Sequence, residues 1–208
     1  MRNLRIAAMV AAIITTVALP GTAGEAPLSV AGFTLGRPIE EYADRVVMES
    51  ALPVRYMEHL REVEIVPQEG FKSGLIAYGT CHNPNSIVRI KLKYAEGSLD
   101  FYQELLKRFK QKFGEPDEYQ GDPFGVFISW KWSFTDSRQN RISLVLQHNL
   151  KDEDEKIGNA LKLTLSNHLE EDASCFQRKK YDRLQELRHR LPNAGPPGEP
   201  MWGRLIPN

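Results

Sequence analysis

Apolar and polar residues alternate along most of the chain after residue 25, which is the pattern of strands with one buried face. The alternation predicts strands within residues 28–36, 73–81, 86–94, 126–134, 141–148 and 159–166. Residues 54–66 fit either a strand or a helix, and their β-branched ending favours a strand in the second half. Because short polar links separate the last three predicted strands, we expect an antiparallel meander with one solvent-exposed face. In SIVRIKLKY, residues 86–94, the apolar face carries Val88, Ile90, Leu92 and Tyr94, and the polar face carries Arg89, Lys91 and Lys93.

Other segments repeat their apolar residues at helical spacing. Ser98 is a suitable N-cap for a helix over residues 98–114, which ends in glycine. A helix is also predicted over residues 39–51, because it follows Pro38 and has acidic residues in its first turn. From residue 167 to residue 191 the chain is polar with apolar residues at helical spacing, which predicts a C-terminal helix.

Together these elements predict an α+β fold, in which an antiparallel β-sheet meander has helices packed on one face and a C-terminal helix attached to it. We expect residues 25–191 to form a single α+β domain. It is divisible into two helix-plus-meander halves, about 28–96 and 97–166, followed by the C-terminal helix 167–191. Residues 192–208 are rich in Pro and Gly, and we expect an extended tail there.

The N-terminal segment, residues 1–24, differs from the rest of the chain. Arg2 and Arg5 precede an uncharged apolar run, and small residues follow it. This pattern predicts a secretory signal peptide, cleaved after Ala23 or Gly24, and the alternative is an uncleaved membrane anchor. We therefore expect an exported protein of the bacterial periplasm or the extracellular space. No integral membrane segment is expected after cleavage, because no second apolar run approaches the ~20 residues that span a bilayer.

Charge and motifs argue against several functional classes. The chain has 27 basic and 27 acidic residues, and loss of Arg2 and Arg5 with the signal leaves 25 against 27, a net charge of −2. This balance argues against nucleic acid as the main partner. The sequence contains no GxGxxG, Walker A, GxSxG or CxxC motif. We therefore predict no catalytic residue and no cofactor.

Cys81 and Cys175 are the only cysteines, 94 residues apart. A c-type haem requires Cys-X-X-Cys-His, but Tyr78 stands where the first cysteine is needed. A reactive Cys81 needs a base, and the adjacent His82 would point to the opposite side of a strand. Export permits the third alternative, a disulfide between Cys81 and Cys175, which we favour because it leaves no cysteine over.

The row of Arg89, Lys91 and Lys93 is a candidate site for an anionic ligand or an acidic partner. Lys131 and Lys162 extend the row if their strands join the same sheet. The competing interpretation is a solvated sheet face whose lysines guard an edge.

Aromatic residues supply further candidates. Trp130 and Trp132 line either the core or a ligand pocket, and their spacing favours the core. Trp202 in the tail is a candidate for docking in a partner's groove, against the alternative of a frayed tail. His168 and Asp172 are four residues apart on a predicted helix, but a solvated pair is expected and no metal site is predicted.

Residues 98–146 combine a helix, the turn FGEP, the strand WKWSF and the strand RISLVLQH, and LGRPIEEY near Leu35 repeats the Gly-X-Pro turn. This order resembles the small β-lactamase-inhibitor-like modules of periplasmic assembly proteins. The resemblance implies a non-catalytic binding or assembly module. It carries over no functional residue, and the lipid-anchored cysteine usual in that family is missing here.

The leading hypothesis is therefore an exported, non-catalytic cell-envelope protein that acts as a binding or assembly module with an envelope protein as its partner. Two alternatives remain open. One is a thiol-based envelope enzyme or redox protein that uses Cys81, and the other is a small-ligand carrier whose aromatic pocket contains Trp130 and Trp132.

Overall fold

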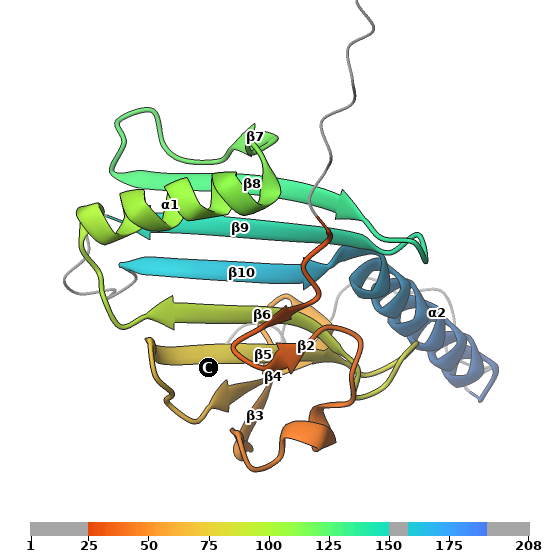
Figure 1. Cartoon of the computed structure of the whole chain (residues 1–208). Helices are drawn as coiled ribbons and strands as arrows, with labels where there is room; N and C mark the ends of the chain where they lie inside the picture. The colour runs from red at the N-terminus through yellow and green to blue at the C-terminus, as the bar shows by residue number, and fades with distance from the viewer. Residues whose placement is uncertain (1–24, 150–157, 191–208) are drawn as a thin grey trace, which may run out of the picture.

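The computed structural model describes residues 25–149 and 158–190. Its main element is an antiparallel sheet of eight strands in the order β3-β4-β5-β6-β10-β9-β8-β7 (Figure 1). A two-stranded hairpin and the 3-10 turn η1 (Ile39–Tyr42) precede this sheet. The strands are β1 (Ser29–Val30), β2 (Phe33–Thr34), β3 (Val46–Val54), β4 (Met57–Ile65), β5 (Phe71–Gly79), β6 (Ile87–Tyr94), β7 (Glu118–Tyr119), β8 (Phe127–Thr135), β9 (Arg141–Asn149) and β10 (Asn159–Leu165).

Two meanders meet in the middle of the sheet. β3 to β6 are neighbours in chain order, and so are β7 to β10. β6 and β10 pair antiparallel, with Leu161 opposite Leu92 and Lys162 opposite Lys91. Helix α1 (Leu99–Phe113) carries the chain from the end of β6 toward the far edge, where β7 begins. The β6–β10 pairing therefore makes one continuous sheet from two distant parts of the sequence.

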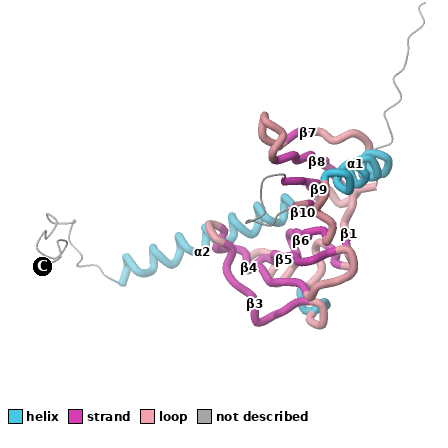
Figure 2. Tube along the Cα trace, turned by 90° about the vertical axis from the view of Figure 1, so that its left-hand side faces the viewer, coloured by secondary structure: helices cyan, strands magenta, loops and turns pink. Residues whose placement is uncertain are grey.

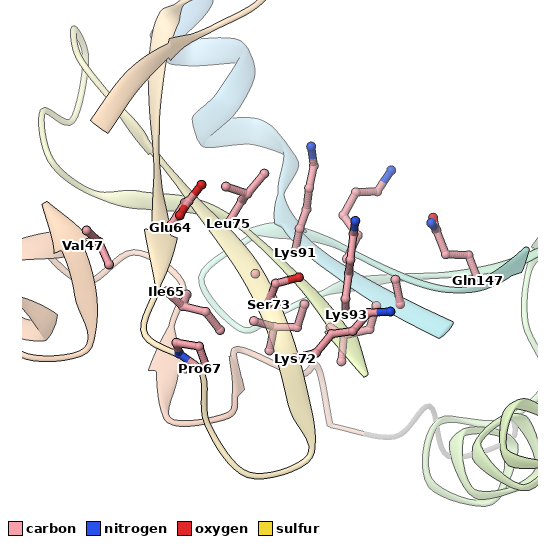
Figure 3. Close-up of a pocket in the computed structure, with 15 residues that line it drawn as sticks. Val47, Glu64, Ile65, Pro67, Lys72, Ser73, Leu75, Lys91, Lys93 and Gln147 are labelled. Atoms are coloured by element: carbon pink, nitrogen blue, oxygen red, sulfur yellow. The ribbon is translucent and has the colours of Figure 1, made fainter. Parts of the chain in front are cut away.

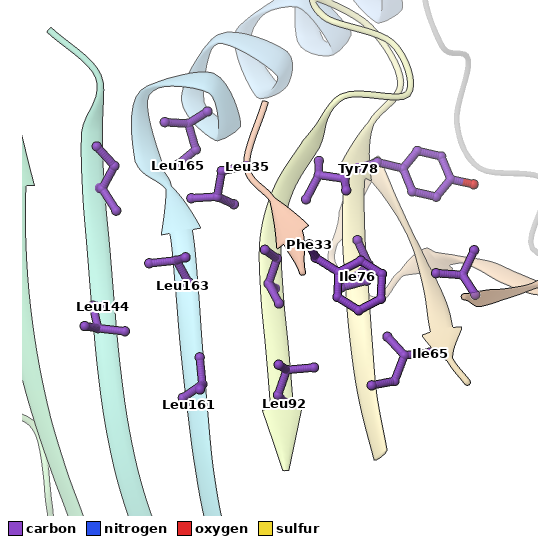
Figure 4. Close-up of a cluster of buried hydrophobic side chains, with 14 of the residues drawn as sticks. Phe33, Leu35, Ile65, Ile76, Tyr78, Leu92, Leu144, Leu161, Leu163 and Leu165 are labelled. Carbon is purple, nitrogen blue, oxygen red and sulfur yellow. The ribbon is translucent and has the colours of Figure 1, made fainter. Parts of the chain in front are cut away.

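Helix α1 covers one face of the sheet and closes the main core. The Ser98 hydroxyl caps α1 by accepting the N–H of Phe101 at 3.3 Å, as the sequence predicts. Tyr102 is buried against the sheet, and the Trp132 indole donates to the Gly114 carbonyl at 2.9 Å. Figure 4 shows how leucines of adjacent strands, such as Leu92, fill the same core next to the β1–β2 hairpin.

Helix α2 (Ser166–Arg190) follows β10 directly and lies against the end of the opposite face. Leu169 packs against a second cluster that contains Leu60 and Val88, and Lys180 lies 3.5 Å from Glu58 of β4. Beyond residue 176 the helix is almost entirely exposed, and Figure 2 shows this part extending away from the sheet.

The predicted α+β class, the antiparallel sheet and the attached C-terminal helix are confirmed. The helix predicted over 39–51 is wrong. Only the single turn η1 forms there, and β3 follows as an edge strand with Val46 opposite Ile65. Val88 also departs from the predicted face, because a register shift next to Tyr78 moves it into the second cluster.

Some predictions concern other parts of the chain. The predicted signal peptide and the tail with Trp202 lie outside the described residues. Within residues 25–149 and 158–190, no helix is long and apolar enough to cross a membrane.

Candidate functional site

The sheet face opposite α1 carries the predicted basic row. Lys131 of β8 pairs with Val145 of β9, Val145 pairs with Lys162 of β10, and Lys162 pairs with Lys91 of β6. The strands of all three lysines therefore join one sheet, as the extended row requires. Paired residues on adjacent antiparallel strands lie on the same face. The register thus brings together Lys91 and Lys162, which are 71 residues apart in sequence.

A groove of about 760 Å³ runs over this face between the curled β3–β4 edge and β9. Figure 3 shows Lys91, Lys93 and Gln147 projecting on the same side, with Leu75 and Glu64 across from them. Among the described residues that line the groove, Glu64 is the only acid. Its cationic lining consists of Lys72, Lys91, Lys93 and Lys162.

A smaller hollow of about 240 Å³ adjoins the groove, and Lys162 lines both. Arg89 and Lys131 add two cations to this hollow, and no acidic residue of the described chain lines it. Its other lining residues are Gln120, Ser143, Val145, Thr164 and Ser166. We refer to the two spaces as the groove and the hollow.

Burial and neighbouring cations lower the pKa of two lysines on this face, Lys162 and Lys91. Burial lowers the pKa of Lys162, and the charges of Arg89, Lys91 and Lys131 lower it further. Burial and the charge of Arg89 also lower the pKa of Lys91, while Glu62 acts in the opposite direction. Burial lowers the pKa of Arg89 although its guanidinium lies 3.9 Å from the Glu62 carboxylate. Half-buried like charges thus face one another, and a bound anion would relieve their repulsion.

The predicted disulfide is confirmed. Cys81 is bonded to Cys175, so the loop after β5 is tied covalently to α2. The described residues contain no free cysteine. The thiol-based chemistry considered for Cys81 needs a thiolate, and the disulfide-bonded sulfur cannot supply one.

Asp172 is a site residue whose role the sequence analysis missed. Its buried carboxylate accepts the backbone N–H groups of Thr80 at 3.0 Å, Cys81 at 2.9 Å and His82 at 2.7 Å. The one available signal is the i, i+3 spacing of Asp172 and Cys175, which puts both on the same helix face. Asp172 is therefore a structural anchor rather than half of a solvated pair with His168.

The tryptophan candidates lie away from the groove. Trp132 is buried in the core, as its spacing favours, and the ring of Trp130 packs against that of Tyr119 at a tilt of 60°, with 4.8 Å between the ring centroids. Neither lines the groove or the hollow. The part of the chain that the structure describes contains no group of three or more His, Cys, Asp or Glu side chains arranged to hold a metal ion.

No protein-family model, curated protein or solved structure matches this chain. The resemblance over residues 98–146 therefore stays a prediction.

Proposed function

We propose that this chain is an exported, non-catalytic binding protein of the cell envelope, and that its groove holds an acidic group of its ligand or partner. The observation that carries the proposal is the convergence of six cationic side chains on one uncovered sheet face. These are Lys72, Arg89, Lys91, Lys93, Lys131 and Lys162.

The charge balance inside the groove supports a ligand rather than a merely solvated face. Lysines that only guard a sheet edge stand apart and point into water. Here Lys91 and Lys162 are directly opposite each other and half-buried, and no described carboxylate lies within 4 Å of either. Like charges in this position destabilise a sheet, and such local costs are typical of functional sites.

The groove also has the dimensions and floor of a ligand site. A volume of about 760 Å³ falls within the few hundred to about 1,000 Å³ of small-molecule sites. Val47, Leu75 and Ala160 add apolar surface between the lysine stems. An acidic molecule with some apolar surface is therefore the ligand that the groove suits.

The test uses a fluorescent trianion, methoxypyrene trisulfonate, as the probe of the groove. We expect the wild-type chain to bind it, and we expect the double variant Lys91→Glu and Lys162→Glu to bind at least ~10-fold more weakly, because charge is reversed at the centre of the row. Lys107→Glu is the matched control, since Lys107 is exposed on α1 at the other face. Failure of the wild type to bind, or equal affinity in all three proteins, would overturn the proposal.

A further inference from the structure

The geometry points to a more specific ligand: we infer that the hollow is a subsite for a phosphate group. This inference rests on the proposed function, because the hollow adjoins the groove through Lys162. It adds the chemical class of the acidic group and the residues that select it.

The cations reach the hollow from three strands. Lys131 and Lys162 lie in one row across the sheet and are separated by Val145 of the intervening strand. Two strand spacings place their backbones ~10 Å apart. The Lys131 ammonium is paired with Glu118 of β7 at 3.0 Å, so an anion above Val145 meets the Lys162 ammonium directly and shares Lys131 with that carboxylate. Arg89 approaches from β6, one row away, opposite Thr164. A bound group is thus approached from several directions, which suits a tetrahedral anion.

Arg89 contributes a largely buried guanidinium group to the lining of the hollow. Its side chain is 12% exposed, and its Nε is buried without a hydrogen-bond partner among the described residues. Among the residues that the structure describes, its Nη atoms contact the Met57 sulfur, at 3.8 Å, and Glu62, at 3.9 Å, both on β4. A buried guanidinium N–H is rarely left without a strong acceptor. Because the Nε has almost no accessible surface, a phosphate in the hollow would pair with the terminal nitrogens of the guanidinium.

Three hydroxyl groups complete the lining. Ser143 and Thr164 are cross-strand partners in the same row as Arg89, and Ser166 is the first residue of α2. None of these hydroxyls donates to another residue in the described ranges. The positive end of the dipole of α2 lies beside the hollow and adds to its preference for an anion.

The number and charge of the donors favour phosphate over carboxylate. A phosphate monoester carries about −1.5 to −2 charges near pH 7 and three terminal acceptor oxygens. A carboxylate carries one charge, and its acceptor positions lie in one plane. Three cations and three hydroxyls line the hollow, which is more than a single carboxylate can use. Outside the lining, Lys131 has Glu118 at 3.0 Å and Arg89 has Glu62 at 3.9 Å, whereas no carboxylate of the described residues pairs with Lys162. The remainder of a phosphate ester would extend past Lys162 into the groove, toward Leu75.

Calorimetric titration at constant ionic strength tests the inference with three probes: inorganic phosphate, glycerol phosphate and acetate. We expect both phosphates to bind at least ~10-fold more tightly than acetate, as the stronger charge-assisted hydrogen bonds require. Tighter binding of glycerol phosphate assigns the subsite to an ester, and tighter binding of inorganic phosphate assigns it to the free ion. Equal affinity for acetate and both phosphates would overturn the inference.

Variants locate the binding. The double variant Ser143→Ala and Thr164→Val should weaken phosphate binding at least ~5-fold while leaving the trisulfonate affinity within about twofold, because it removes neutral donors of the hollow only. Ser133→Ala is the matched control, since Ser133 pairs with Ser143 but does not line the hollow. Unchanged phosphate affinity in the double variant, with trisulfonate binding intact, would reject the phosphate subsite and leave the proposed function standing.

Discussion

A single buried carboxylate organises the loop that follows β5. Asp172 accepts three consecutive backbone N–H groups, from Thr80, Cys81 and His82. A Cβ on Gly79 would lie 2.8 Å from the Asp172 Oδ1, so glycine is needed for this close approach. The carboxylate thereby satisfies the N–H groups of Cys81 and His82 and shares that of Thr80 with the His59 carbonyl, 3.1 Å away.

Replacement of this carboxylate should cost substantial stability. In Asp172→Asn, only one side-chain oxygen remains as an acceptor, and the amide NH₂ group faces backbone donors. We expect the free energy of unfolding in urea to fall by about 2–4 kcal/mol, since each buried donor left unsatisfied costs about 1–3 kcal/mol. Asp182→Asn, at an exposed position of the same helix, should change it by less than about 0.5 kcal/mol. A loss below about 1 kcal/mol for Asp172→Asn would contradict the anchoring role.

Loss of the Asp172 carboxylate should destabilise the fold, whereas loss of one charge from the cationic face should stabilise it. Removal of one charge from the facing pair, in Lys162→Met, should raise the free energy of unfolding at pH 7 by about 0.5–1 kcal/mol, because like charges directly opposite destabilise a sheet. The pKa of Lys162 is lower in the folded chain than its ordinary value. The wild type therefore becomes more stable as the pH rises through that lowered pKa, and the gain in Lys162→Met shrinks. Urea unfolding of both proteins at pH 7 and pH 10 measures this, and a less stable variant at pH 7 would contradict it.

Local patterns at the residue scale predicted some of the site. Strict alternation in β6 placed Arg89, Lys91 and Lys93 on one polar face, and the structure agrees. Lys162 joined them only on the condition that β10 belongs to the same sheet, which depends on long-range pairing. The role of Asp172 depends on where α2 crosses the loop after β5, and no local pattern encodes that position.

At the scale of elements, α2 has two parts with different support. Its first part is held by the Cys81–Cys175 disulfide, by Asp172 and by Leu169 in the second cluster. Its last part is exposed. Helix spacing alone predicted the whole helix but not this division. The helix predicted over 39–51 failed for a related reason, because pairing with β4 outweighed local amphipathic spacing in β3.

Removal of the disulfide should test how much of this support is covalent. We expect the double variant Cys81→Ala and Cys175→Ala to lose about 2–5 kcal/mol in the free energy of unfolding, since closure of a loop of this length restricts the unfolded chain. Because the bridged cysteines are 94 residues apart, we expect the loss to lie toward the upper end of that range. Amide exchange should still show protection around Asp172, because its hydrogen bonds do not need the bridge. Ser174→Ala, an exposed neighbour, serves as the control.

Loss of protection in the first part of α2 without global unfolding would show that the bridge alone holds the helix.

At the scale of the whole molecule, the groove exists because two meanders join at β6 and β10. Each meander by itself supplies a partial row of cations, and their pairing brings Lys91 opposite Lys162. α1 occupies the other face with the main core, so the basic face of the sheet is left uncovered between β3 and β9. The sequence predicts the strands and their polar faces, but the order in which distant strands pair follows from the packing of the complete core.

Because neighbouring cations lower the pKa of Lys162, the pH dependence of probe binding is the sharpest test of the groove as a whole. The charges around Lys162 are Arg89, Lys91 and Lys131, and together with burial they lower its pKa. Binding of the trisulfonate probe requires the protonated amine, and its sulfonates remain ionised throughout the alkaline range. Affinity should therefore be constant near pH 7 and should fall as the pH rises, beginning below the ordinary lysine pKa of 10.5.

The variant Lys162→Arg separates this residue from its neighbours. Because a guanidinium stays protonated well above the lysine range, the variant should hold the probe to a higher pH than the wild type, with similar affinity at pH 7. Lys107→Arg, on the face covered by α1, should leave the pH profile unchanged. Fluorescence titration from pH 7 to pH 11 gives the three profiles. If wild type and Lys162→Arg lost the probe at the same pH, Lys162 would not be the charge that the anion contacts, and the row would have to act through Lys91 or Lys93 alone.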